Sequence, residues 1–119
     1  MKILIIDNSV QMIERLEEIL SEAEISLTIY RALSYDAGAV LFKETIPDIV
    51  LLNISLHGNE SFRLLKEIKE AKVTTSVIVL SIHTDDHIRE QCKLLSADFF
   101  LDKYYDFEKN TFCYKNHRR

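Results

Sequence analysis

The sequence predicts an α/β domain built on a five-stranded parallel sheet with helices on both faces. Five short apolar segments recur along the chain, and most are continuous rather than alternating, which is typical of central strands covered on both faces. Segments with apolar residues at helical spacing lie between them. Because strands that alternate with helices form parallel sheets through right-handed crossovers, the pattern favours a β-α unit repeated five times.

The predicted strands are rich in β-branched or aromatic residues. The second strand has the weakest signal, because polar residues dilute its apolar content. The five strands are predicted at Ile3–Ile6, Ser26–Tyr30, Ile49–Ile54, Val77–Leu80 and Phe99–Leu101.

Each predicted helix has an apolar stripe. Asn8 or Ser9 can cap the first helix, and the stripe of the second helix follows Ser34. A fifth helix, over 106–117, has only a faint stripe. The stripes of the first four helices are Met12, Ile13, Leu16, Ile19 and Leu20; Ala37, Val40 and Leu41; Leu64, Leu65 and Ile68; and Ile88, Cys92 and Leu95.

Length and composition fit one globular domain spanning residues 1–119. The net charge of −4 gives no general reason to expect nucleic acid or an anionic membrane surface as the partner. The apolar run after Met1 is too short for a signal peptide or a membrane span, so the expected location is the cytoplasm. Cys92 and Cys113 lack the spacing of a metal site and are expected to be reduced thiols.

Polar residues end four of the five predicted strands. They are Asp7-Asn8, Asn53, Ser81 and Lys103. In open parallel sheets, ligands bind beyond the carboxyl ends of the strands. We therefore expect these residues to gather in one pocket at one edge of the sheet.

In this order, the strand-end motifs resemble those of the receiver domains of bacterial response regulators in two-component signalling, over essentially the whole chain. Asp7-Asn8 is similar to the family's acidic pair, and Asn53, before Leu56-His57-Gly58, takes the place of the phosphoacceptor aspartate. Ser81 matches the hydroxyl residue, and Ser96-Ala97-Asp98 leads to Lys103 as the family's Gly-Ala-Asp leads to its lysine. The resemblance implies the flavodoxin-like receiver fold with strand order 2-1-3-4-5.

The family's chemistry, as the resemblance implies it, needs three carboxylates that hold one Mg²⁺ while the aspartate of the third strand attacks a phosphoryl donor. Asn53 is an amide, so it is a poor nucleophile and has no charge to ligate a cation. Asn8 replaces the second acid of the pair, which leaves one carboxylate of three. Ile82 and Tyr104 depart from the family as well, by crowding the entrance and by replacing the proline after the lysine. We therefore predict no enzymatic activity, no metal site and no cofactor.

Each of these residues also has an ordinary structural interpretation. Asp7 can cap the first helix, Ser81 can be a structural hydroxyl, and Lys103 can be a strand-end lysine bonded to Asn53 or Asp7. Phe100 takes the place of the family's switch aromatic but fits a core position equally well. Loop residues explain the histidines better than a metal site does; they are His57, His83 and His87.

The leading hypothesis is a pseudo-receiver, which regulates through protein contacts without phosphorylation. The resemblance implies docking through the fourth helix, fifth strand and fifth helix, a face that includes Phe100 and Tyr104, and a homodimer is one form that this contact could take. The alternative is a small-ligand or anion sensor that uses the strand-end pocket and Lys103. A phosphoacceptor at Ser55 or Ser81 is the least favoured interpretation.

Overall fold

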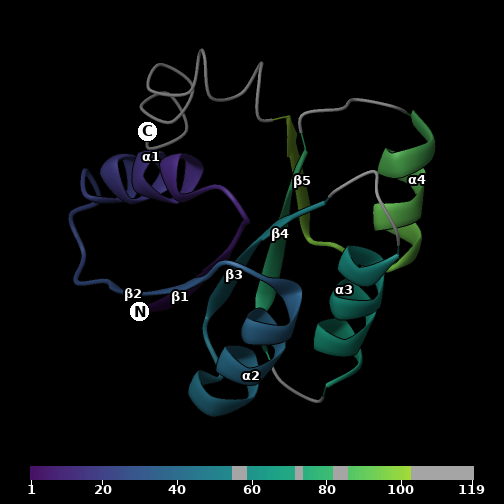
Figure 1. Cartoon of the computed structure of the whole chain (residues 1–119), viewed down its shortest axis with the longest axis horizontal. Coiled ribbons are helices and arrows are strands. Elements are labelled where there is room, and N and C mark those ends of the chain that lie inside the picture. Colours follow the sequence, from purple (N-terminus) through teal and green to yellow (C-terminus); the bar gives the residue numbers. More distant parts are fainter. Residues whose placement is uncertain (55–58, 72–73, 82–85, 103–119) are drawn as a thin grey trace.

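The computed structural model describes residues 1–54, 59–71, 74–81 and 86–102. In this part of the chain, strands and helices alternate from the N-terminus onward (Figure 1). The elements are β1 (Lys2–Ile6), α1 (Val10–Leu20), β2 (Thr28–Ala32), α2 (Tyr35–Thr45), β3 (Ile49–Asn53), α3 (Glu60–Glu70), β4 (Ser76–Ser81), α4 (Asp86–Leu94) and β5 (Phe99–Asp102). The predicted fifth helix lies outside the described residues.

The five strands form one sheet in the order β2-β1-β3-β4-β5, and every neighbouring pair is parallel. This confirms the predicted fold class and strand order. At the carboxyl ends, Ile6 pairs with both Ala32 and Leu52, and Asn53 pairs with Leu80. The register therefore aligns the residues that follow the apolar strands.

Helices cover both faces of the sheet, as predicted. On one face, α2, α3 and α4 pack on strand residues such as Leu4, Val50 and Val79. On the other face, α1 packs through Ile13 and Leu16 on the intervening strand residues. The two layers are visible in Figure 1, with α1 on one side of the strands and α2 on the other.

The boundaries of β2 differ from the prediction by two residues. The sequence pattern starts this strand at Ser26, whereas the structure starts it at Thr28, which pairs with Lys2. The Ser26 carbonyl oxygen instead accepts a hydrogen bond of 3.2 Å from the Met1 amino group. Pairing with the five residues of β1, rather than apolar content, decides where β2 lies.

The predicted stripe of α2 is confirmed at Leu41, which is partly buried and packs against the core, but is wrong at its other two residues. Val40 is 54% exposed and Ala37 is also exposed, whereas Gly38 and Phe42 are the buried residues of this helix. A Cβ atom on Gly38 would lie 2.7 Å from Cδ1 of Ile6. The glycine therefore lets α2 approach β1 more closely than a side chain would allow.

The predicted helix starts are confirmed for α1 and α2. The hydroxyl oxygen of Ser9 accepts a hydrogen bond from the Met12 amide, and that of Ser34 accepts one from the Ala37 amide. Ser9, rather than Asn8, is the cap of α1. Among the described helices, none combines the length and the apolar character that crossing a membrane requires.

Cys92 is the cysteine that the structure describes. It is buried in α4, and burial raises the pKa of its thiol to about 11. The thiol is therefore protonated at neutral pH and packs as a small apolar group.

Candidate functional site

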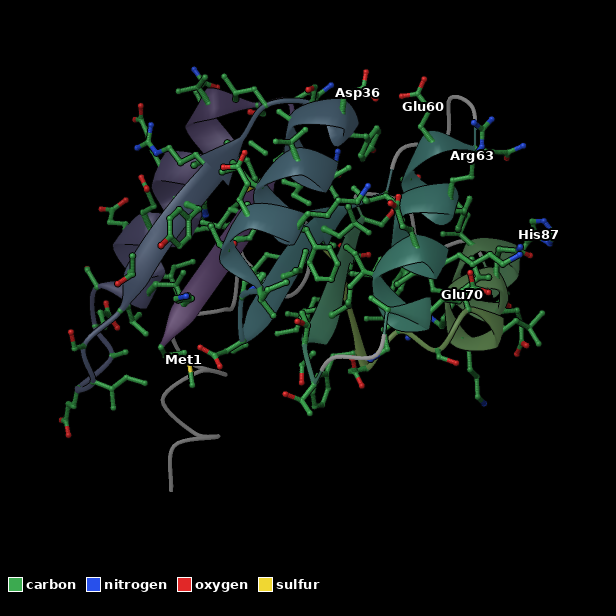
Figure 2. The ribbon with its side chains drawn as sticks, turned by 90° about the horizontal axis from the view of Figure 1, so that it is seen from below. Met1, Asp36, Glu60, Arg63, Glu70 and His87 are labelled. Carbon is green, nitrogen blue, oxygen red and sulfur yellow. The ribbon has the colours of Figure 1, made fainter. Side chains whose placement is uncertain are left out.

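The carboxyl ends of the strands meet at one edge of the sheet, where α2 and α3 begin. Figure 2 shows Asp36 and Glu60, near the starts of α2 and α3, at this edge, and Met1 at the opposite edge. The candidate site therefore lies among the ends of β1, β3, β4 and β5 and the first turns of the helices.

Asp7 follows β1 and is buried, with only 2% of its surface exposed. Its amide donates a hydrogen bond of 3.0 Å to the Ala32 carbonyl oxygen, which extends the pairing of β1 with β2. Its Oδ1 accepts a hydrogen bond of 2.9 Å from the Ser9 amide. Asp7 thus holds the turn that leads into α1, while Asn8 beside it is exposed.

Asn53 is the last residue of β3 and is partly buried. Because Ile6 pairs with Leu52, Asp7 and Asn53 stand at the same level on neighbouring strands, with their backbones about 5 Å apart. The register therefore brings these two predicted site residues together.

Tyr35, which the sequence analysis did not single out, reaches this edge from the first turn of α2. Its hydroxyl group donates a hydrogen bond of 2.8 Å to the Asn53 carbonyl oxygen, and its ring packs against the core. Since β1 lies between β2 and β3, the side chain spans the end of β1. The sequence signal that could have identified Tyr35 is an aromatic residue directly after Ser34, the residue that caps α2.

Ser81 ends β4 and pairs with Asp102 of β5. Both are buried, with 0% and 5% of their surfaces exposed, and both interact with other groups of the chain. The sequence analysis missed Asp102. Its signal was an acidic residue directly after the apolar Phe99–Leu101 segment.

Phe100 is partly buried between β5 and α4, and the guanidinium carbon of Arg89 lies 4.7 Å from the centre of its ring. Phe100 therefore packs against the core and also contacts an exposed side chain, so both predicted roles remain open.

Of the predicted histidines, His87 lies in α4 and is exposed. Lys103, Tyr104, His57 and His83 lie outside the described residues, so their roles stay predictions.

The comparisons with known proteins identify the family. The family model described as the response regulator receiver domain matches residues 3–111. The chain belongs to the response regulator receiver domain family.

Solved receiver structures share the fold over nearly the whole chain. A receiver domain of a DNA-binding response regulator from Colwellia psychrerythraea 34H is 21% identical, with a TM-score of 0.79 and 98% of each chain covered. The chemotaxis protein CheY4 of Vibrio cholerae is 15% identical, with a TM-score of 0.77 and coverage of 97% of this chain and 96% of that one. CheY of Borrelia burgdorferi, solved with CheX, BeF₃ and Mg²⁺, is 21% identical, with a TM-score of 0.75 and coverage of 93% and 88%.

The described edge of this receiver domain does not fit Mg²⁺. The ion prefers near-octahedral coordination by hard oxygen donors, usually with one or two carboxylates. Of the carboxyl groups described at this edge, that of Asp7 accepts a backbone hydrogen bond and Asp102 interacts with another group of the chain, while Asn8 and Asn53 supply uncharged amides. Among the described residues, no three His, Cys, Asp or Glu side chains lie together in a way that could hold a metal ion.

A small pocket lies beside Asp7 at the receiver's carboxyl edge. Its volume is about 80 Å³. That volume suits a few water molecules or a small ion, since sites for metabolites typically measure about 300 Å³ or more. Its lining residues are Ile6, Asp7, Asn8, Leu33, Ser34 and Tyr35.

Proposed function

We propose that this receiver domain is a regulatory interaction module that works without phosphorylation. The observation that carries the proposal is Asn53, an amide at the end of β3 and level with the buried Asp7. The family resemblance places the phosphoacceptor aspartate at this position. A receiver that keeps the fold but lacks the acceptor retains its surface for protein contacts.

The chemistry of the site supports the proposal in two ways. The amide nitrogen of Asn53 is conjugated to its carbonyl group, so it does not attack a phosphoryl donor. In addition, Asn8 and Asn53 supply uncharged amides at two of the three carboxylate positions that the family resemblance implies for holding Mg²⁺ and neutralising a transferring phosphoryl group. The nucleophile and the metal act as a unit in such reactions. The loss of both therefore favours a domain that takes up no phosphoryl group.

The alternative function is a small-ligand or anion sensor at the strand ends, where a small pocket lies beside Asp7. This pocket of about 80 Å³ leaves room for an ion rather than a metabolite, and its lining includes neither Asn53 nor Ser81. The buried carboxylate of Asp7 at its wall disfavours an anion. We therefore rank protein interaction above ligand sensing.

We place the partner contact on the face formed by α4, β5 and the predicted fifth helix, which the family resemblance implies. Phe100 belongs to the described part of this face, whereas Tyr104 and the fifth helix lie outside it. A homodimer remains one form of this contact, and the net charge of −4 disfavours nucleic acid. The cytoplasmic location stays a prediction.

The experiment is incubation of the chain with acetyl phosphate and Mg²⁺, followed by intact-mass spectrometry. We expect no mass increase and, in a parallel thermal-shift titration, no saturable stabilisation by Mg²⁺ at submillimolar concentration. A stoichiometric gain of one phosphoryl group would refute the proposal.

A further inference from the structure

Strand β2 forms an open edge of the sheet (Figure 1). It pairs with β1 on one side, and no strand in the described part of the chain pairs with its other side. The Thr28 amide donates a hydrogen bond of 2.8 Å to the Met1 carbonyl oxygen, and the Ala32 carbonyl oxygen also accepts a bond from the β1 side. Backbone groups of successive residues in a strand point to opposite sides. The N–H and C=O groups of Ile29 and Arg31 therefore point away from β1.

β2 lacks the features that usually protect such an edge. Lysine, proline or a bulge normally prevents an exposed strand from pairing with another chain. β2 contains neither lysine nor proline, and its residues pair with β1 in an unbroken register. Its one charged side chain, Arg31, donates a hydrogen bond of 2.9 Å from Nε to Oε2 of Glu17 on α1. The charge is therefore directed to α1 rather than across the edge.

Apolar residues continue this edge beyond both ends of the strand. Leu27 precedes β2 and packs on the core beneath α1, as Ile29 does. Leu33 follows β2 and is 52% exposed. On the other face of the strand, Tyr30 is partly buried against the core beneath α2. An edge with unpaired backbone groups and apolar flanks is a template for the addition of another strand.

We propose that two copies of this chain pair in antiparallel orientation through their β2 strands, with Tyr30 opposite Tyr30 of the second copy. Ile29 of each copy then lies opposite Arg31 of the other, and their outward backbone groups form hydrogen bonds in both directions. The two Tyr30 side chains make an aromatic pair across the contact, which stabilises neighbouring strands. Leu27 comes next to Leu33 of the other copy, where both bury apolar surface.

The side chains favour this register over its neighbours. A shift of two residues in one direction sets Arg31 opposite Arg31 of the second copy, and like charges directly opposite each other are destabilising. A shift in the other direction sets Tyr30 opposite Thr28, which loses the aromatic pair. The edge is therefore complementary to itself in one register.

This self-complementarity favours a second copy over an unrelated extended segment as the occupant of the edge. Symmetric pairing uses the β2 edges of both copies, so association ends at a dimer. β2 and β5 are the opposite edges of the sheet, so this contact is separate from the face of α4 and β5. The inference goes beyond the proposed function and does not depend on it, because phosphoryl uptake measures a different site.

The test is amide hydrogen exchange of the ¹⁵N-labelled full chain, followed by NMR in dilute solution and at about 1 mM. Sedimentation velocity at the same concentrations should show a monomer and a dimer, respectively. Exchange of the Ile29 and Arg31 amides should slow about tenfold in the dimer, because these amides become hydrogen-bonded. The Tyr30 amide, which points to β1, should exchange at the same rate in both samples.

Leu33→Lys and Leu94→Lys form a matched pair of variants. Each replaces an exposed leucine with a cation, at positions that are 52% and 75% exposed. Leu33→Lys removes both apolar contacts with Leu27 and should weaken the dimer about tenfold. Leu94 ends α4, toward the opposite edge of the sheet, so Leu94→Lys should leave the dimer unchanged.

Several results would overturn the proposal. A chain that stays monomeric at about 1 mM would do so, as would assemblies larger than a dimer. Unchanged exchange of the Ile29 and Arg31 amides in a dimer would show that the copies meet elsewhere. Equal weakening by the two variants, or dissociation by Leu94→Lys alone, would also remove β2 as the contact.

Discussion

Asp7 and Asn53 lie side by side at the ends of neighbouring strands, but one side chain is an acid and the other an amide. Asp7 is buried, and one oxygen of its carboxyl group accepts a hydrogen bond from the Ser9 amide. Asn53 stands one strand away at the same level and carries no charge. A second carboxylate at this place would repel the first, since like charges directly opposite each other on neighbouring strands are destabilising.

Asn53→Asp is expected to destabilise the fold when no divalent cation is present. The repulsion with Asp7 should lower the free energy of unfolding by about 1 kcal/mol, a typical size for a point substitution. The measurement is thermal unfolding in EDTA-treated buffer. Asn59→Asp makes the same chemical change at the exposed start of α3, where the helix dipole favours an acid, so its melting temperature should not fall. A rise in melting temperature for Asn53→Asp would contradict this account.

Tyr35→Phe should also destabilise the fold, by about 1 kcal/mol. The substitution keeps the packed ring but removes the hydroxyl group that donates to the Asn53 carbonyl oxygen. Tyr30→Phe is the control, because the Tyr30 hydroxyl makes no hydrogen bond to the described residues. Chemical denaturation compares the two. Equal effects would mean that the contact between Tyr35 and Asn53 contributes nothing.

Among the elements, the turn from α4 into β5 contains a strained residue. Ser96 has a φ of 67°, in the left-handed region that glycine adopts at least cost. The family resemblance places a glycine at this position. The Ser96 amide donates to the Lys93 carbonyl oxygen and closes the turn.

Ser96→Gly is expected to stabilise the domain by up to about 1 kcal/mol, because it relieves this strain. The gain is reduced by the greater flexibility of glycine in the unfolded chain. Ser96→Ala keeps the strain and should give no gain. Melting temperatures of both variants test this, and equal gains would indicate that the hydroxyl group rather than the backbone was responsible.

Asp98 ties β5 to β4 and to the end of α3. Its Oδ2 accepts hydrogen bonds of 2.7 Å from both the Lys69 ammonium and the Val77 amide. Partial burial raises the pKa of the Asp98 carboxyl group, but the bonds from Lys69 and Val77 outweigh this, so the pKa lies below its usual value. The carboxylate form is therefore the one that stabilises the fold.

This depressed pKa predicts how stability depends on pH. The contribution of Asp98 is present above the unfolded-state pKa of about 4 and is lost as the pH falls through the lower folded-state pKa. Asp98→Asn should thus be less stable than the native chain at neutral pH, with the gap narrowing below about pH 4. Melting temperatures across a pH series measure this gap. A gap that stays constant with pH would show that the charge of Asp98 is not involved.

For the whole molecule, the repetition of apolar segments and helical stripes was sufficient to predict the parallel sheet and its two helical layers. The inner face of α2 was predicted only in part, because Gly38 has no side chain and its burial depends on the close approach to Ile6. The positions of Asp7 and Asn53 could be predicted, because each lies at the carboxyl end of an apolar strand segment. The contact of Tyr35 did not, since it depends on a side chain that crosses the end of β1.

The most direct test of the account is phosphoryl uptake by a set of four chains. They are the native chain, Asn53→Asp, Asn8→Asp and the double variant, each incubated with acetyl phosphate and Mg²⁺ and measured by intact-mass spectrometry. A nucleophile without a metal gains little, because catalysis here depends on positioning and charge neutralisation. We predict uptake by the double variant alone, with little or none by either single variant. Equal rates for Asn53→Asp and the double variant would contradict the claim that the missing acid at position 8 impairs the site. Uptake by the native chain would contradict the central claim that this receiver works without phosphorylation.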